Sequence, residues 1–207
     1  GSLVKAGEGT LSLSADNAYT GTANVQEGSL NMTGVVQTGQ IVKQGAGTLS
    51  LTNNNNDYTG GINVQQGALS ITGVVSGGPI VKQGAGTLSL TNNNTYAGGT
   101  DIQQGTLSIK RASSLGDGDV IIREGSTLET QTSTTITNKI NLTPETPVDD
   151  LLTTAATIST VGKENITQIT SSIGGSVSGL IKSGDGTLSL TADNAYAGNT
   201  VIQQGTL

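Results

Sequence analysis

Thr87-Leu88-Ser89-Leu90 is one copy of a short phrase that recurs along the chain. The first leucine of the phrase returns at Leu11, Leu30, Leu49, Leu69, Leu88, Leu107, Leu128, Leu188 and Leu207. Successive members lie about 20 residues apart, except between Leu128 and Leu188, where the gap is about three times as long. Because that gap can hold three further periods, the phrase predicts about ten turns of one spiral, each called a coil below.

A longer repeat contains the short one. A glycine-rich heptad recurs at residues 7–13, 45–51, 84–90 and 184–190, and a tyrosine follows each copy at Tyr19, Tyr58, Tyr96 and Tyr196. Within one unit, Val42-Lys43-Gln44-Gly45 parallels Val64-Gln65-Gln66-Gly67. The unit is about 40 residues long, twice the short period, and therefore predicts two coils rather than one.

The local pattern predicts strands. Before about residue 145 no segment has apolar residues at the helical spacing, which excludes helical arrays. Pairs such as Leu49 and Leu51 alternate with polar residues in short runs, bounded by corners rich in Gly, Asn and Ser. The pattern predicts an all-β fold, a parallel β-helix whose coils stack about 4.8 Å apart in a rod of roughly 50 Å.

The corner residues suit tight turns. We expect Gly45, Gly47 and Gly67 to adopt positive φ values, which glycine does at no steric cost. Asparagine runs at residues 53–56 and 92–94 also suit corners, because Asn tolerates the left-handed region. These runs lie two coils, about 9.6 Å, apart, so we expect no direct side-chain ladder between them without a partner coil. The repeated tyrosines are predicted to pack in the corners rather than to form exposed platforms for sugars.

Composition limits the possible functions. The 207 residues include no Cys and no His, and 12% are charged. A Ser-His-Asp triad, a Cys-His pair and a metal site with His are therefore impossible within this chain, and we predict neither a cofactor nor enzymatic activity. The formal net charge of −6 makes nucleic acid an unfavourable partner.

Carboxylates remain as possible catalytic groups. The best cluster in the sequence holds Asp117, Asp119, Arg123, Glu124 and Glu129. An acid and base pair for cleaving a polysaccharide needs carboxyl groups about 5 to 10 Å apart. We favour the alternative that Asp117 and Asp119 are turn residues, and their single Gly-Asp-Gly-Asp run lacks the tandem copies of a calcium-binding repeat.

Residues 84–107 carry a resemblance to a known family. The order Gly-Ala-Gly-Thr-Leu-Ser-Leu-Thr, Thr-Tyr-Ala-Gly-Gly-Thr and Ile-Gln-Gln-Gly-Thr-Leu resembles the passenger-associated repeat of bacterial autotransporters. Residues 113–128 resemble the coil that often follows this repeat. The resemblance covers about residues 3–128 and 178–207.

The resemblance implies a right-handed β-helix from a type V secreted passenger. Such a passenger is displayed on the surface of a Gram-negative bacterium or released from it, and its own C-terminal outer-membrane barrel is an implied partner. We expect the chain to be a fragment of a longer passenger, with residues 1–2 as a cloning scar. The cut ends of the helix could pair, so self-association is a further expectation.

The repeat lapses between Leu128 and Leu188. We expect regular repeats at residues 3–128, degenerate coils at 129–179 and a regular repeat at 180–207, all in one domain. A loop is predicted to leave the spiral around residues 144–157. Its candidate partner-binding residues are Pro144, Glu145, Thr146, Pro147, Val148, Asp149, Asp150 and Leu151. Excursions from a repeat array often carry its contacts, and a degenerate coil with a turn is the alternative.

Three functions remain open. The chain is predicted to be a surface-displayed adhesin or stalk that attaches to a protein or glycan of a host cell. A released passenger that acts as ligand or toxin on a host receptor is the alternative, and a polysaccharide-cleaving enzyme ranks below both. The aromatic content of 2% disfavours a strong protein-binding hot spot over most of the surface.

Overall fold

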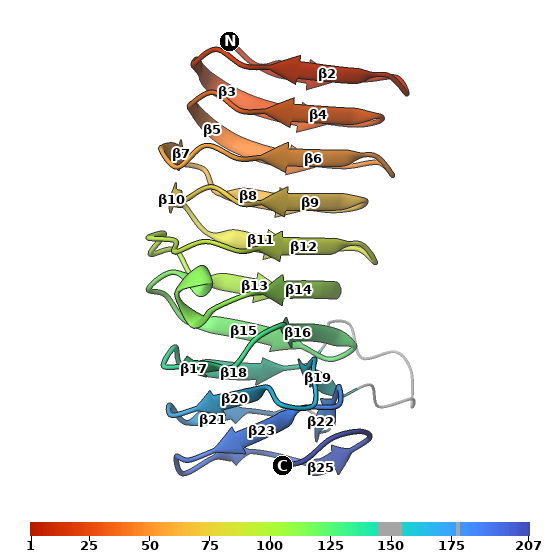
Figure 1. Cartoon of the computed structure of the whole chain (residues 1–207), viewed down its shortest axis with the longest axis vertical. Coiled ribbons are helices and arrows are strands. Elements are labelled where there is room, and N and C mark those ends of the chain that lie inside the picture. Colours follow the sequence, from red (N-terminus) through yellow and green to blue (C-terminus); the bar gives the residue numbers. More distant parts are fainter. Residues whose placement is uncertain (145–154, 177–178) are drawn as a thin grey trace.

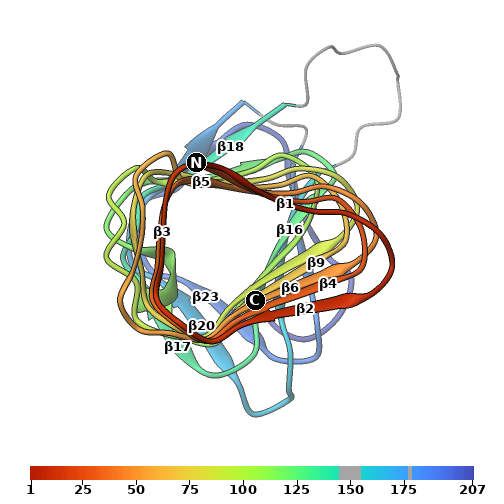
Figure 2. The same ribbon diagram turned by 90° about the horizontal axis from the view of Figure 1, so that it is seen from above.

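A computed structural model of the chain shows a right-handed parallel β-helix, in which each coil stacks on the one before (Figure 1). The structure describes residues 1–144, 155–176 and 179–207. Seen from above, the coils enclose one core with three sides (Figure 2). The all-β parallel β-helix predicted from the sequence is therefore confirmed.

Sheet B holds the repeated leucine phrase and has ten strands. In order they are β2 (Thr10–Leu13), β4 (Ser29–Met32), β6 (Thr48–Leu51), β9 (Ala68–Ile71), β12 (Thr87–Leu90), β14 (Gly105–Ile109), β16 (Ser126–Thr130), β19 (Ala156–Thr160), β22 (Gly179–Ser183) and β25 (Asn199–Ile202). From Leu11 to Leu128 the phrase leucines are register partners of one another, strand by strand. This column of leucines forms one wall of the buried core.

Sheet A has twelve strands; it forms the second side and continues round a corner onto the third side in the N-terminal part of the rod (Figure 2). They are β1 (Leu3–Lys5), β3 (Asn17–Val25), β5 (Val36–Lys43), β7 (Asn56–Tyr58), β8 (Ile62–Val64), β10 (Val75–Gly77), β11 (Ile80–Lys82), β13 (Thr100–Ile102), β15 (Val120–Arg123), β18 (Ile140–Thr143), β21 (Ile173–Gly175) and β24 (Ala195–Tyr196). Along these strands buried residues alternate with more accessible ones, as Ile80, Val81 and Lys82 do.

The third side changes along the rod. Sheet C supplies it in the C-terminal part, with β17 (Thr134–Ile136), β20 (Ile166–Ile169) and β23 (Thr187–Leu190). Before sheet C, the same side of the molecule carries the short 3-10 helix η1 (Ala112–Leu115) (Figure 1). Within the described residues, no helix has the length and apolar character needed to span a membrane.

The long gap in the leucine series does not contain three coils, contrary to the sequence prediction. Leu128 of β16 pairs with Ile158 of β19, and Ile158 pairs in turn with Lys182 of β22. Leu188 then lies in β23, on sheet C rather than on sheet B. The coils of this region are longer than the regular period. The leucine phrase of the last repeat therefore lies on sheet C, whereas the earlier copies lie on sheet B.

One asparagine contact also contradicts the sequence prediction. Asn92 donates from Nδ2 to Oδ1 of Asn54 at 3.1 Å, although the two residues lie 38 positions apart. The intervening corner holds Gly73, where a side chain would meet the backbone oxygen of Asn53 at 1.7 Å. Because Gly73 has no side chain, the amides of Asn92 and Asn54 can meet across the intervening coil.

The corner glycines serve two different needs. Gly67 has φ of +72°, as predicted. Gly45 and Gly47 do not have positive φ, so that part of the prediction is wrong. A Cβ at either position would lie 1.7 Å from a carbonyl oxygen of the coil before, and glycine is needed there for close stacking.

Candidate functional site

The candidate site lies on the outer face of sheet A, where β11, β13 and β15 run side by side. Val81, Asp101 and Ile121 are register partners in these three strands and face away from the buried positions. Their neighbours Ile80, Ile102 and Ile122 are completely buried, which fixes the direction of each outward side chain.

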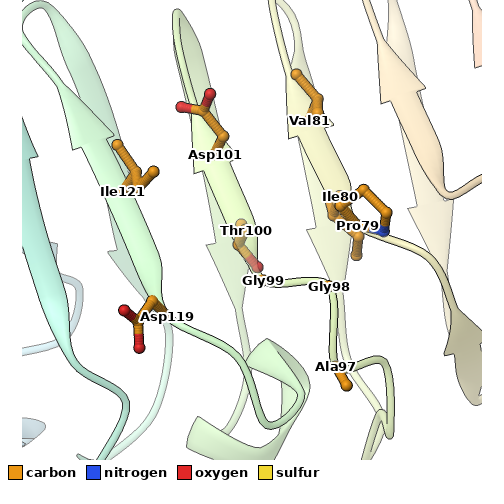
Figure 3. A pocket seen from close by; sticks show the side chains of 10 residues that line it. All are labelled: Pro79, Ile80, Val81, Ala97, Gly98, Gly99, Thr100, Asp101, Asp119 and Ile121. Atoms are coloured by element: carbon orange, nitrogen blue, oxygen red, sulfur yellow. The ribbon is translucent and has the colours of Figure 1, made fainter.

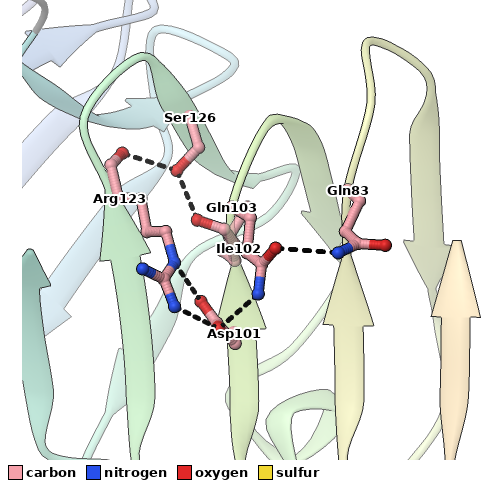
Figure 4. A network of polar contacts seen from close by, with 6 residues as sticks. All are labelled: Gln83, Asp101, Ile102, Gln103, Arg123 and Ser126. Carbon is pink, nitrogen blue, oxygen red and sulfur yellow. Dashed lines mark hydrogen bonds and ion pairs between the residues drawn. The ribbon is translucent and has the colours of Figure 1, made fainter. Parts of the chain in front are cut away.

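Asp101 and Arg123 form an ion pair on this face. Arg123 donates from Nε to Oδ1 of Asp101 at 3.0 Å and from Nη2 to Oδ2 at 2.8 Å (Figure 4). This two-point contact raises the pKa of Arg123, chiefly through the hydrogen bonds to Asp101. The side chains of Arg123 and Asp101 are 26% and 20% exposed, so the pair remains accessible.

A row of amides extends the ion pair along the rod. Gln103 donates to Oδ2 of Asp101 at 2.8 Å, and Gln83 donates to Oε1 of Gln103 at 2.9 Å (Figure 4). The hydroxyl of Ser126, buried at the next corner, lies 2.7 Å from the carbonyl of Arg123 and 2.8 Å from that of Ile102. Asp101 is therefore held by three hydrogen bonds from two neighbours.

A shallow hollow of about 180 Å³ lies beside the ion pair (Figure 3). Its lining residues are Pro79, Ile80, Val81, Ala97, Gly98, Gly99, Thr100, Asp101, Asp119 and Ile121. The hydroxyl of Thr100 points inward and lies 2.7 Å from Oη of Tyr96. The charged groups of the lining are the carboxylates of Asp101 and Asp119. This cavity, called the Asp101 hollow below, combines apolar side chains with two carboxylates.

The charged groups in and beside the Asp101 hollow are the carboxylates of Asp101 and Asp119 and the guanidinium of Arg123. The chain contains neither His nor Cys. In the part of the chain that the structure describes, no three His, Cys, Asp or Glu side chains come together as they would for a metal ion. Asp101 is engaged by Arg123 through the ion pair.

The five-residue cluster proposed from the sequence is divided between different parts of the rod. Arg123 lies on sheet A and pairs with Asp101, a residue that the sequence analysis did not select. Glu129 lies on sheet B, where it accepts from Ser108 at 2.9 Å and from Gln131 at 3.2 Å. Asp117 and Asp119 are exposed on the segment between η1 and β15, and Glu124 follows β15. Residues that are close in the sequence do not form one cluster here, because successive sides of a coil face different directions.

The predicted partner-binding loop falls almost entirely on residues that the structure does not describe. Pro144, directly after β18, is the one described member, and residues 145–151 lie outside the described ranges. β19 begins at Ala156, so the C-terminal boundary of the loop lies before the predicted residue 157.

Two of the repeated tyrosines pack as predicted. Tyr58 and Tyr96 are completely buried, and burial raises the pKa of both hydroxyls above the ordinary value. Tyr19 and Tyr196, in the first and last units, are only half-buried. The prediction of corner tyrosines is therefore confirmed for the two central units.

The sequence analysis missed a row of buried lysines. The side chains of Lys5, Lys43, Lys82 and Lys182 enter the interior, and the last three are completely buried. The sequence analysis aligned Val42 with Val64, but the register partner of Val64 is Lys43. The predicted parallel between residues 42–45 and 64–67 is therefore wrong by one position. The recurring pair of an aliphatic residue and lysine before a glycine-rich corner was a signal that could have identified them.

Each ammonium group binds backbone carbonyls at a corner. Nζ of Lys82 donates to the carbonyls of Gln83, of Gly84 at 2.6 Å and of Gln104 at 3.2 Å. Gln104 belongs to the following coil, so the lysine joins two coils. Among the described residues no carboxylate forms an ion pair with Lys82, and burial lowers the pKa of Lys82 to about 8.

Comparison with known proteins agrees with this architecture. The family described as passenger-associated-transport-repeat matches residues 3–32, 41–71, 80–109 and 180–207. No curated protein and no solved structure gives a significant match. The matched segments make up more than half of the chain and contain the leucine phrase, the corner glycines and the buried lysines. The chain therefore belongs to the passenger-associated-transport-repeat family, whose repeats are typical of autotransporter passenger domains.

Proposed function

We propose that this passenger segment is an adhesin rod, displayed on the surface of a Gram-negative bacterium, that attaches to a protein or glycan of a host cell. The observation that carries the proposal is the ten-stranded parallel sheet B, which extends along the whole rod. Ten coils about 4.8 Å apart span roughly 50 Å, so the rod can hold contact sites away from the membrane.

The distribution of side chains supports attachment rather than catalysis. Most of the large apolar side chains lie inside the rod. Hydroxyls predominate on the outer face of sheet B, whereas on sheet A apolar residues such as Val81 and Ile121 stand beside polar ones such as Asp101. The carboxylates that the sequence offered for acid and base chemistry are spread over different sides. Passenger repeats are typical of secreted or surface-exposed proteins, where such a rod meets other cells.

The proposal is tested by the binding of the purified monomeric chain to cultured host cells. A variant in which a short Gly-Ser turn replaces residues 144–152 is compared with the parent chain, because the loop predicted between β18 and β19 is a proposed contact site. Binding by both proteins places attachment on the rod, and loss of binding only in the variant places attachment on the loop. If neither protein binds while both give the circular dichroism of a β-protein, the adhesin proposal is wrong for this segment.

A further inference from the structure

The Asp101 hollow stands where one unit departs from the repeat. Asp101 occupies a position that is Asn24, Asn63 or Val201 in the other units. Pro79 occupies a position that is Ser2, Gln40 or Gly179 elsewhere. An isolated surface ion pair contributes only about 0–1 kcal/mol to stability, so the change from Asn to an Asp–Arg pair has no strong structural cause. Local departures from an otherwise consistent sequence are expected at functional positions.

The size of the hollow limits its ligand. Its volume is about 180 Å³. Pockets for drug-sized molecules are about 300–1,000 Å³, so this hollow suits a single small ring. Because the hollow is open on one side, the rest of a longer ligand would remain in solvent.

The carboxylates of Asp101 and Asp119 differ in how many of their hydrogen-bond acceptor positions are already occupied. Asp119 is exposed, and its carboxylate has no hydrogen-bond partner among the described residues. Asp101 receives three hydrogen bonds, which fix its orientation and leave about one of roughly four acceptor positions open. Both groups can therefore accept hydrogen bonds from hydroxyls, and Asp101 needs no reordering to do so.

The apolar side chains offer a complementary surface. Val81 and Ile121 flank Asp101 on the neighbouring strands, and Pro79 lies at the corner next to Gly98. A Cβ on Gly98 would lie 2.5 Å from the nitrogen of Pro79, so the absence of a side chain helps to keep this corner open. A ring with C–H groups on one face and hydroxyls at its rim matches such a surface.

A bound cation suits this hollow less well. Arg123 compensates the charge of Asp101, which leaves Asp119 as the one unpaired charge of the lining. Calcium takes six to eight oxygen ligands, more than two carboxylates in separate coils supply. We propose that the Asp101 hollow binds one neutral, hydroxyl-rich sugar ring of a glycan. The inference rests on the proposed function, because it names the chemical class of partner to which the rod attaches.

The test is an NMR titration of the chain with methyl glycosides of glucose, galactose, mannose and N-acetylglucosamine, up to about 50 mM, a range suited to millimolar affinity. We expect one of them to shift the amide signals of Asp101, Asp119 and Ile121. Asp119→Asn and Asp101→Asn are expected to weaken binding by about tenfold, because each removes a charged acceptor. Asp101→Asn introduces the residue found in two other units, so the fold accepts it. Asp57→Asn, the same change at an exposed position on β7, is the matched control.

The outcomes separate this inference from the proposed function. Sugar binding that both hollow variants weaken and the control leaves unchanged supports the inference. Binding of methylamine or calcium at the hollow without any glycoside overturns it, as does sugar binding that neither variant changes. If no glycoside binds while the chain still attaches to cells, the adhesin proposal stands and the sugar site is wrong.

Discussion

At the scale of single residues, the buried lysines explain why the repeat unit contains two coils. In sheet A, Lys5, Val25, Lys43, Val64 and Lys82 occupy successive positions of one inward column. Two ammonium groups about 4.8 Å apart repel by about 3.5 kcal/mol at an effective dielectric constant of 20, and the repulsion halves when the spacing doubles. Alternation with valine therefore keeps each lysine bound to carbonyls without a charged neighbour.

This account predicts the effect of Val64→Lys. The new ammonium would lie between Lys43 and Lys82, which are the register partners of Val64. We expect the free energy of unfolding to fall by about 3 kcal/mol or more, through repulsion and loss of solvation. Urea denaturation measures it, with Val64→Met as the control of similar length without charge. Equal losses in the two variants would contradict the account.

The lysines also predict a dependence of stability on pH. Burial lowers the pKa of Lys82 from 10.5 to about 8 in the folded chain. Between these values the unfolded chain binds more protons than the folded one, so the free energy of unfolding rises with pH. Below pH 8 both states are protonated, and this contribution is constant. We expect the melting temperature of the parent, relative to Lys82→Met, to rise between pH 8 and 10; a fall in that window would contradict the assignment.

The two buried tyrosines predict opposite responses to removal of the hydroxyl. Oη of Tyr96 lies 2.7 Å from Oγ1 of Thr100, whereas Oη of Tyr58 has no hydrogen-bond partner among the described residues. The residue four positions after Tyr58 is Ile62, which offers no hydroxyl. Tyr96→Phe should lower the free energy of unfolding by about 1 kcal/mol, and Tyr58→Phe should leave it unchanged or raise it. Urea denaturation compares them, and a larger loss in Tyr58→Phe would refute the explanation.

At the scale of strands and corners, the short pattern predicted much of the fold. The alternation of Leu88 and Leu90 with polar residues predicted strands, and the glycine-rich segments predicted corners. The period failed where coils became unequal, because leucine spacing counts coils only when every coil has the same length. The residues between β18 and β19 lengthen the chain without adding a coil to sheet B.

Two glycines separate the cost of backbone conformation from the cost of stacking. Gly7 and Gly67 have φ of +78° and +72°. A Cβ on Gly7 would meet nothing within 4 Å, whereas one on Gly67 would lie 2.5 Å from the carbonyl oxygens of Gly45 and Gly47. Gly7→Ala should therefore lower the free energy of unfolding by about 1–2 kcal/mol, the cost of the left-handed conformation.

Gly67→Ala should lower the free energy of unfolding further, because the coils must also move apart. The alanine Cβ would lie 2.9 Å from Nζ of Lys43, which disturbs the carbonyl site of the lysine as well. Chemical denaturation of both variants gives the difference. If the two substitutions cost the same, close stacking does not restrict this corner.

At the scale of the whole molecule, the candidate site was less predictable than the fold. The sequence places Asp101 among repeated residues that serve as outward strand positions, so nothing in its local pattern marks it. Its partner Arg123 belongs to the following coil, and only the register of β13 and β15 brings the two together. Register depends on the length of each coil, which the leucine period gives only approximately. Departure from the repeat, visible as Asp in place of Asn, was the available signal.

The central claim is that one continuous β-helix keeps its register from β16 to β19. Thr127 and Thr157 are register partners in β16 and β19, although β17, β18 and residues 144–155 separate them along the chain. Because the chain has no Cys, a pair of introduced cysteines reports this contact alone. Oxidation of Thr127→Cys with Thr157→Cys should form an intramolecular disulfide as readily as Ser70→Cys with Ser89→Cys, partners in the regular part of the rod. If the second pair forms a disulfide and the first remains reduced, the helix is not continuous in this register.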